Sequence, residues 1–156
     1  MSTEGGGQEA ILNDINLGSG VAVFMQIENH FRFAIASGRL AAGERLPSVA
    51  DLSKRIGVNP NTVAKAYRDL EVMGLAHARR GRGVFVGNGI RGKCEEDCRA
   101  RIVMGLNEVV GEAKAAGMTA GEITNAVKAI YGSEGGLYGP MPKSVAALIK
   151  PKKGGS

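Results

Sequence analysis

The sequence predicts a mainly α-helical protein with one small β-hairpin, in which a winged helix-turn-helix domain precedes a C-terminal two-helix dimerisation segment. Three observations favour this fold class. Apolar residues recur at spacings of three and four in five stretches, which is typical of amphipathic helices. The second and third stretches are joined by only four residues, GVNP, which suits two helices that cross steeply. Two short alternating stretches then flank an arginine-rich turn, which indicates the hairpin.

The first two helices are expected within residues 24–57. The first helix carries one apolar stripe and is expected to end at Gly38. That stripe consists of Phe24, Ile27, Phe31 and Ile35. After a turn, Ser48 stands three residues before Asp51, as in a capping box, and begins the second helix. This helix ends at Gly57 and turns three side chains inward. They are Val49, Leu52 and Ile56.

The third helix has strong signals at both ends. Asn59 is a favourable N-cap, and Pro60 suits the first helical position. The helix is expected to run through Met73 and to stop at Gly74. Its buried face consists of Val63, Tyr67 and Leu70. The stretches LAHA and VFV then predict two strands around the turn ARRGRG. The order of elements is therefore that of a winged helix-turn-helix.

Two further helices follow a linker, GNGIRG. A long one is expected to end at Gly117, and Thr119 with Glu122 forms the capping box of the last. The apolar stripe of the long helix comprises Cys94, Cys98, Ile102, Leu106, Val109, Ala113 and Ala116. Two helices alone cannot bury two such stripes, so we expect a homodimer. Its expected interface residues are Ile102, Leu106, Val109, Ile123, Val127 and Ile130.

The chain is expected to divide into four parts. Residues 1–13 are polar and glycine-rich, and we interpret them as a flexible tail. Residues 14–88 form the winged helix-turn-helix domain, and residues 93–131 form the dimerisation segment. Residues 132–156 contain a short apolar stretch, SVAALI, within a second flexible tail.

Positive charge is concentrated in the predicted winged domain. Of the formal net charge of +5, residues 20–88 contribute all, with ten Lys or Arg against five Asp or Glu, while the remainder holds ten of each. A localised basic excess indicates either a polyanionic partner, such as nucleic acid or an acidic membrane, or an ordinary solvated surface. No stretch approaches the roughly 20 apolar residues that cross a bilayer, and residues 1–9 do not resemble a secretory signal. A cytoplasmic protein is therefore expected.

Double-stranded DNA is the expected partner, and the candidate contacts lie on the second and third helices and on the turn of the hairpin. Helix N-termini offer free N–H groups to phosphate, and asparagine can pair with adenine. Three arginines on one tight turn repel each other unless an anion is present. The candidate DNA-binding residues are Ser48, Asn59, Asn61, Thr62, Lys65, Arg68, Arg79, Arg80, Gly81 and Arg82. Ser48, Asn59 and Thr62 can alternatively serve only as helix caps.

Three motifs within residues 24–86 resemble the GntR family of bacterial and archaeal regulators: SGRLAAGERLPS, VNPNTVAKAYRDLE and GLAHARRGRGVFV. The resemblance implies a homodimeric regulator whose helix-turn-helix covers residues 49–68. The part after Asn88 is too short for a large effector-binding domain. It resembles the YtrA-like subfamily, in which a short helical tail serves dimerisation and regulators often repress transporter operons.

The resemblance is uneven at the expected DNA contacts. The wing residues Arg80, Gly81 and Arg82 match the family, but Ala50, Pro60 and Ala64 replace residues that are often basic in it. The resemblance therefore implies no particular base preference. The expected function is a repressor that binds an inverted-repeat operator; its genes and any small-molecule effector are not indicated.

Other functional sites have weak support. Cys94 and Cys98 can hold a metal or sense oxidants, but their place on an apolar stripe favours small buried residues. His77 on the hairpin strand is more simply structural. No nucleophile–base motif, phosphate-binding loop or metal-ligand cluster is present, so neither an enzyme nor a cofactor is expected. Two alternatives stay open: a winged helix that binds protein, and a ligand sensor with its site at the dimer interface or in the winged domain.

Overall fold

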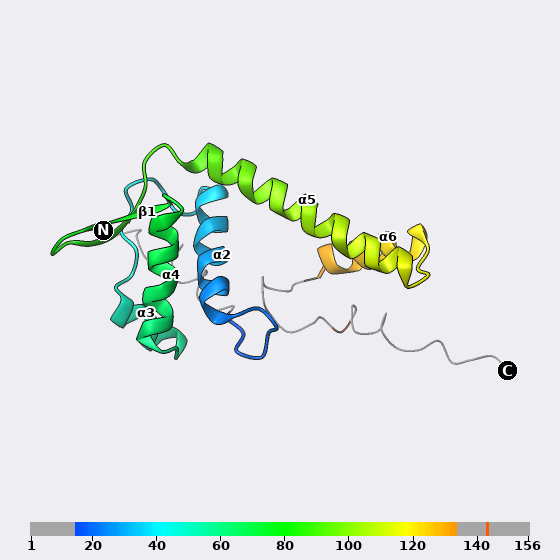
Figure 1. Ribbon diagram of the computed structural model, residues 1–156, viewed down its shortest axis with the longest axis horizontal. Coiled ribbons are helices and arrows are strands. Elements are labelled where there is room, and N and C mark those ends of the chain that lie inside the picture. Colours follow the sequence, from blue (N-terminus) through cyan, green and yellow to red (C-terminus); the bar gives the residue numbers. More distant parts are fainter. Residues whose placement is uncertain (1–14, 134–142, 144–156) are drawn as a thin grey trace. The chain divides into compact units, whose positions relative to one another are not determined.

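The computed structural model describes residues 15–133 and Lys143. These residues form five helices and one two-stranded antiparallel sheet (Figure 1). In chain order the elements are α2 (Val23–Ala36), α3 (Val49–Ile56), α4 (Pro60–Val72), β1 (Ala76–Arg79), β2 (Gly83–Val86), α5 (Arg91–Ala115) and α6 (Ala120–Tyr131). The predicted mainly α-helical fold with one small β-hairpin is confirmed. The expected flexible tail at residues 1–13, and all but residues 132, 133 and 143 of the one at 132–156, lie outside the described residues.

The chain divides into two compact units, and the division falls between Arg101 and Ile102, within α5. The first unit contains the winged helix-turn-helix together with the first turns of α5. The second contains the remainder of α5 and α6. The expected boundary between the DNA-binding and dimerisation parts, at residues 88–93, lies before this structural division. It stays a prediction about where the two functions separate.

Side-chain caps begin α3 and α4 where the sequence predicts them. The Ser48 hydroxyl accepts a hydrogen bond from the Asp51 amide at 3.1 Å. The Asn59 side-chain oxygen accepts one from the Asn61 amide at 2.8 Å. Between the two helices, Gly57 adopts φ 66°, which an L side chain rarely tolerates. These local interactions stop α3 and restart the chain as α4 within a few residues, which sets the steep crossing of a helix-turn-helix.

Helix α2 is buried on more than its apolar face. Besides the predicted Ile27 and Phe31, the polar residues Gln26, Asn29 and His30 are buried. Gln26 is accommodated because its amide group donates to and accepts from backbone atoms of the segment before α2. Fully buried apolar side chains of the first unit include Ile27, Phe31, Leu40, Leu52, Val63 and Leu70. The core thus forms mainly where α2, α3 and α4 meet.

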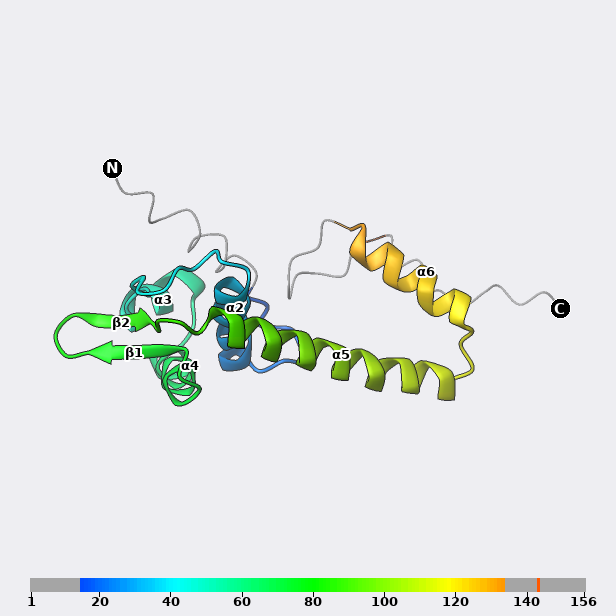
Figure 2. The ribbon, with the colours of Figure 1, turned by 90° about the horizontal axis from the view of Figure 1, so that it is seen from above.

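The hairpin has a third strand-like neighbour that the sequence analysis did not predict. Strands β1 and β2 pair with Ala76 opposite Val86 and Arg79 opposite Gly83 (Figure 2). On the other edge of β2, the Leu46 amide donates to the Val84 carbonyl, and the Val86 amide donates to the Glu44 carbonyl, both at 2.8 Å. The loop before α3 is therefore held against the wing.

The first turns of α5 belong to the core of the first unit. Cys94 and Cys98 are buried, as predicted, and the Cys94 thiol donates a hydrogen bond to the Arg32 carbonyl at 3.2 Å. One turn after Cys98, the Arg101 guanidinium donates to the Asn29 side chain. Burial, together with the neighbouring Cys98, raises the pKa of Cys94 to about 12, so this thiol is protonated and unreactive near neutral pH.

Within the second unit, apolar side chains remain uncovered. Thr119 and Glu122 form the predicted capping box of α6. No described side chain in this unit is buried, although its helices carry many apolar residues. The exposed large apolar residues of the unit include Ile102, Val103, Met104, Leu106, Val109, Met118, Val127, Ile130 and Tyr131. Of the six expected interface residues, only Ile123 is half-buried.

Candidate nucleic-acid interface

The outer face of α4 presents polar and cationic side chains. Asn61, Lys65 and Arg68 are exposed and are spaced so that they lie along one side of the helix. Two other candidates are less available: the Asn59 side chain caps the helix, and Thr62 is half-buried. The opposite side of the helix is buried in the core. Helix α4 therefore presents three polar side chains to solvent on one side.

Lys65 already has two neighbours in the folded chain. Its ammonium group lies 2.8 Å from the Asp69 carboxylate and 4.3 Å from the centre of the Phe24 ring. The hydrogen bond from Lys65 is the main cause that lowers the pKa of Asp69. Lys65 must therefore exchange Asp69 for a base or phosphate if it contacts DNA. The ion pair is exposed to solvent and therefore weak, so this exchange has a small cost.

Behind this ion pair lies a buried carboxyl group that the sequence analysis did not single out. Glu28 on α2 is buried and shares a hydrogen bond with Asp69 on α4. Burial, with the negative charge of Asp69, raises the pKa of Glu28 from 4.5 to about 7. The nearby Arg32 and Lys65 moderate that rise. A carboxyl group that retains its proton can donate to Asp69, which makes the close pair favourable.

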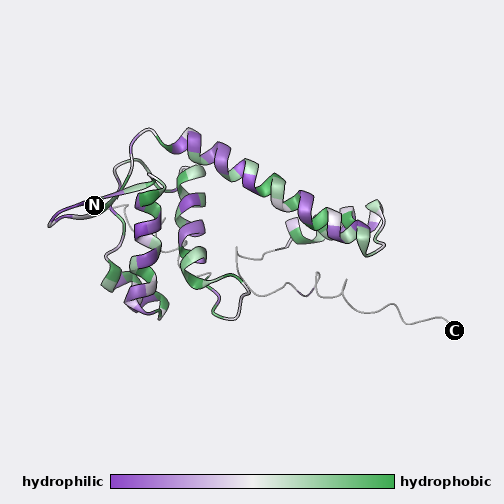
Figure 3. Ribbon diagram, viewed as in Figure 1, coloured by the Kyte–Doolittle hydropathy of each residue, from purple (hydrophilic) through white to green (hydrophobic). Residues whose placement is uncertain are grey.

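The turn of the hairpin is cationic and exposed. Arg80 and Arg82 are exposed, and the Arg82 amide donates to the Arg79 carbonyl at 2.9 Å to close the turn. Gly81 takes φ 73°, which this turn requires at its third residue. Arg79 differs from its neighbours because its guanidinium lies 5.0 Å from the Phe85 ring. The turn is hydrophilic in Figure 3 and projects from the helices in Figure 2.

His77 lies on the strand beneath this turn. Its ring is half-buried and stacks on Phe85, with 6.1 Å between the ring centres. This packing supports the structural interpretation of His77.

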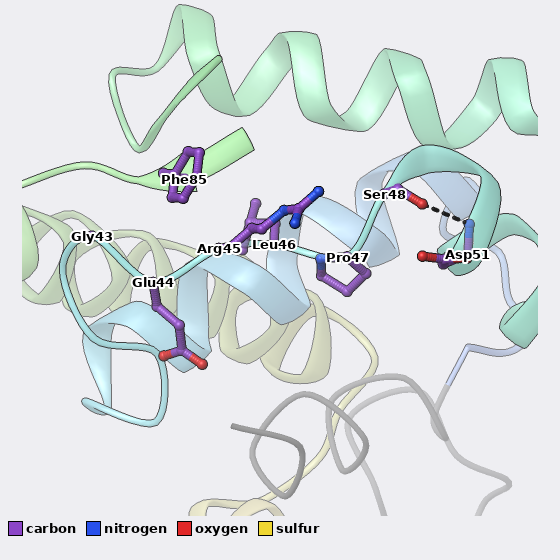
Figure 4. Close-up of a pocket in the computed structure, with 8 residues that line it drawn as sticks. All are labelled: Gly43, Glu44, Arg45, Leu46, Pro47, Ser48, Asp51 and Phe85. Atoms are coloured by element: carbon purple, nitrogen blue, oxygen red, sulfur yellow. Dashed lines mark hydrogen bonds between the residues drawn. The ribbon is translucent and has the colours of Figure 1, made fainter. Parts of the chain in front are cut away.

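A pocket of about 420 Å³ lies between the base of the wing and the start of α3 (Figure 4). Arg45 lines it together with Ser48, Asp51 and Phe85. Arg45 packs so closely over Gly83 that a Cβ there would stand 2.8 Å from its Nε. Arg45 is not among the residues predicted from the sequence, because local spacing does not show that residues 43–46 pair with β2. The signal in the sequence is the apolar Leu46 beside Arg45, because an inward Leu46 in an extended segment turns Arg45 outward.

Tyr67 connects this pocket to the outer helix α4. Its hydroxyl donates to the Pro47 carbonyl at 2.6 Å, one residue before the Ser48 cap. Burial of the ring raises the pKa of Tyr67, so the hydroxyl keeps its proton. The start of α3 is thus attached to α4 by a side chain that the sequence analysis treated only as core.

The candidate DNA residues all fall in the first unit, and the expected dimer residues all fall in the second. The structure brings Ser48 close to the base of the wing, and it gives Asn59 and Lys65 intramolecular partners. Within the described ranges 15–133 and 143, no group of three or more His, Cys, Asp or Glu is arranged to hold a metal ion. No described helix is long and apolar enough to cross a membrane.

The known proteins that this chain resembles are transcriptional regulators. The family described as bacterial regulatory proteins, gntR family, matches residues 25–86. The chain is 30% identical to the HTH-type transcriptional repressor YtrA of Bacillus subtilis, over 72% of this chain and 86% of YtrA. It is 32% identical to the HTH-type transcriptional regulator Rv1152 of Mycobacterium tuberculosis, over 67% of this chain and 82% of that protein. A solved GntR family transcriptional regulator from Listeria monocytogenes matches with a TM-score of 0.58 and 26% identity, covering 72% of this chain and 97% of that one.

Proposed function

The chain belongs to the GntR family of DNA-binding transcriptional regulators, and from this premise we propose that it is a homodimeric repressor that binds an inverted-repeat operator. The observation that carries the proposal is the separation of its two surfaces. One unit presents exposed cationic and amide groups around a helix-turn-helix, and the other presents uncovered apolar side chains. The first surface suits DNA, and the second suits another copy of the chain.

Helix α4 is the element that reads bases. Asn61 can pair with adenine in the major groove, and Lys65 and Arg68 can donate to guanine or to phosphate. Thr62 stands at the same end of the helix and can contact a base edge or a phosphate. Lys65 reaches the DNA by leaving Asp69, whereas Arg68 is exposed and needs no such exchange.

Phosphate contacts position the domain on the duplex. The N-terminus of α3 with Ser48 points free N–H groups towards an anion. We add Arg45 to this group because it lines the same pocket as Ser48. The wing arginines Arg80 and Arg82 bind phosphates of the DNA backbone or enter the minor groove. Arg79, Gly81 and Asn59 support these contacts by shaping the hairpin and capping α4.

Dimerisation covers the apolar residues of the second unit. Leu106 is 49% exposed and Val109 is 61% exposed in the single chain, and such groups are usually buried in soluble proteins. A two-fold axis through α5 and α6 lets each apolar patch meet its own copy. Ile102, Ile123, Val127 and Ile130 lie on the same two helices and share this interface. Two related reading helices then require two related half-sites in the DNA.

Repression follows from occupancy of an operator. The chain matches 86% of the length of YtrA, which is named as a transcriptional repressor. This supports the same sign of regulation here. A dimer that holds two half-sites blocks access to a promoter that overlaps them. The protein acts in the cytoplasm together with the DNA that it binds, and it needs no catalytic group for this role.

The wing provides the direct test. DNA from the region upstream of the protein's own gene is titrated with the protein by fluorescence anisotropy at several salt concentrations. Arg80→Ala with Arg82→Ala should weaken binding to operator and random DNA alike and reduce the salt slope by about two units, because each lost phosphate contact removes about 0.9. Arg99→Ala with Lys114→Ala removes the same charge from exposed sites on α5 and should leave the slope unchanged.

Footprinting of the same DNA tests the remaining parts of the proposal. A protected inverted repeat and lower expression from a linked promoter support a dimeric repressor. Protection of a single half-site, or an unchanged slope for the wing variant, contradicts the proposal.

A further inference from the structure

A second cavity, distinct from the pocket at the wing, lies within the first unit where three elements meet. It has a volume of about 370 Å³ and is lined by the end of α4, the middle of α2 and the first turns of α5. A volume in the range of about 300–1,000 Å³ is typical of sites for small organic molecules. None of the proposed DNA or dimer residues lines it.

The inner wall of this cavity is apolar. Leu75 and Cys94 are buried beneath it, and Ile90 is half-buried and packs against the same core. Met73, at the C-cap of α4, contributes a flexible thioether. These side chains offer an apolar ligand contacts with carbon and sulfur.

The rim carries charge of both signs. Two cations, Arg32 and Lys93, line this cavity together with the acidic Asp97. The Arg32 guanidinium donates a hydrogen bond to the Met73 sulfur, at 2.9 Å, and it also lies near the Glu28 carboxyl group on α2. A thioether is a weak acceptor, so a carboxylate is a much better partner for this half-buried cation. Lys93 is exposed and can approach the same anion, whereas Asp97 disfavours a ligand with more than one negative charge.

We propose that this cavity binds a small organic monocarboxylate with an apolar body, and that this ligand acts as the effector of the regulator. The regulatory part rests on the proposed function above. Met73 and Gly74 lie at the C-terminal end of the reading helix α4, and Ile90 and Cys94 lie at the N-terminal end of α5. The later turns of α5 carry the proposed dimer interface. A ligand held between these ends changes the preferred setting of α4 against α5. In a dimer, this alters the spacing of the two reading helices and hence the affinity for the operator.

Binding is tested on the full chain without DNA. Hexanoate and benzoate are titrated to about 10 mM while the amide and methyl NMR signals of Leu75 and Ile90 are followed, since ligands this small often bind weakly. We expect saturable shifts at these residues, and much smaller shifts with the neutral probes hexanamide and benzamide. Inorganic phosphate, which lacks an apolar body, should not reproduce them.

Two matched variants distinguish the rim from a general charge effect. Lys93→Gln should weaken carboxylate binding at least fivefold, and Lys114→Gln, the same change on an exposed site of α5 away from the cavity, should leave it unchanged. Equal binding of carboxylate and amide probes, no shifts at Leu75 and Ile90, or an unaltered Lys93→Gln titration would overturn the site.

The effector role is tested by repeating the anisotropy titration with the better-binding carboxylate present. The affinity for upstream DNA should change at least threefold in the parent protein and not in Lys93→Gln. A bound carboxylate that leaves DNA affinity unchanged overturns the effector role. If the protein binds no DNA at all, the NMR titration still decides the site, so failure of the proposed function is separable from failure of the cavity.

Discussion

Where α2 meets α4, two carboxyl groups share one hydrogen bond. Glu28 is buried, and its pKa is raised from 4.5 to about 7 by burial first and by Asp69 second. Because the folded-state pKa lies above the ordinary value, the native chain binds this proton more tightly than the unfolded chain does. The contribution of Glu28 to the free energy of unfolding is therefore full below pH about 4.5 and falls as the pH rises to about 7.

Glu28→Gln tests this pH dependence. Glutamine keeps a donor for Asp69 and cannot ionise, so we expect the variant to be more stable than the parent by about 1–2 kcal/mol at pH 8 and nearly equal to it at pH 5. Urea denaturation at both pH values measures the difference. The exposed Glu95→Gln serves as the control, because it should change neither value. The same gain for Glu28→Gln at both pH values would contradict the raised pKa.

At the scale of elements, one hydroxyl group connects two helices. Tyr67 projects from α4 through the core, where its ring packs edge-on against Phe31 with 5.7 Å between centres. Its hydroxyl donates to the Pro47 carbonyl just before the Ser48 cap. The α3 N-terminus, a proposed phosphate site, is therefore positioned from the reading helix.

Tyr67→Phe keeps the ring and removes only this hydrogen bond. It should lower the free energy of unfolding by about 1 kcal/mol, and by more if the Pro47 carbonyl is left without water. DNA binding should weaken without a change in the salt slope, because no charge is lost. Urea denaturation and anisotropy measure the two effects. Tyr131→Phe provides the matched control, because that side chain is 93% exposed. Equal effects from both variants would show that the hydroxyl of Tyr67 has no positioning role.

On the scale of the whole molecule, the two units differ in how well they bury their apolar residues. The first unit has a continuous apolar core that includes Cys94 and Cys98. The second has α6 with no buried residue and a run of exposed side chains on α5. The proposed dimer accounts for this difference, since apolar surface left in water is unfavourable.

Leu106→Glu tests the dimer without truncation. A carboxylate brought into an apolar interface should weaken self-association by at least about 3 kcal/mol, or about a hundredfold in Kd. Analytical ultracentrifugation should show a dimer for the parent and a monomer for the variant at micromolar concentration, with a matching loss of operator affinity. Asn107→Glu adds the same charge at the neighbouring exposed position, and we expect it to remain dimeric. A monomeric parent that still binds its operator tightly would rule out the proposed assembly.

Local signals in the sequence were sufficient for the elements of the first unit. Ser48, Asn59 and Gly57 act within a few residues of themselves, so their caps and turn can be predicted without knowledge of the fold. The same holds for the capping box at Thr119 and for the arginine turn of the hairpin. The inward side chains of α4 also follow from spacing alone, because the period of a helix decides which residues share a face.

Tertiary contacts decided what no spacing encodes. The pairing of residues 43–46 with β2, which sets Arg45 beside Ser48, depends on backbone groups far apart in the chain. The Phe24 ring that engages Lys65 comes from α2, and the Asp69 carboxylate that helps to raise the pKa of Glu28 comes from α4. The apolar stripe of α5 is uniform in sequence, yet its first turns are buried and its later turns are exposed. A repeating pattern states that a face is apolar, and only the folded chain determines what covers it.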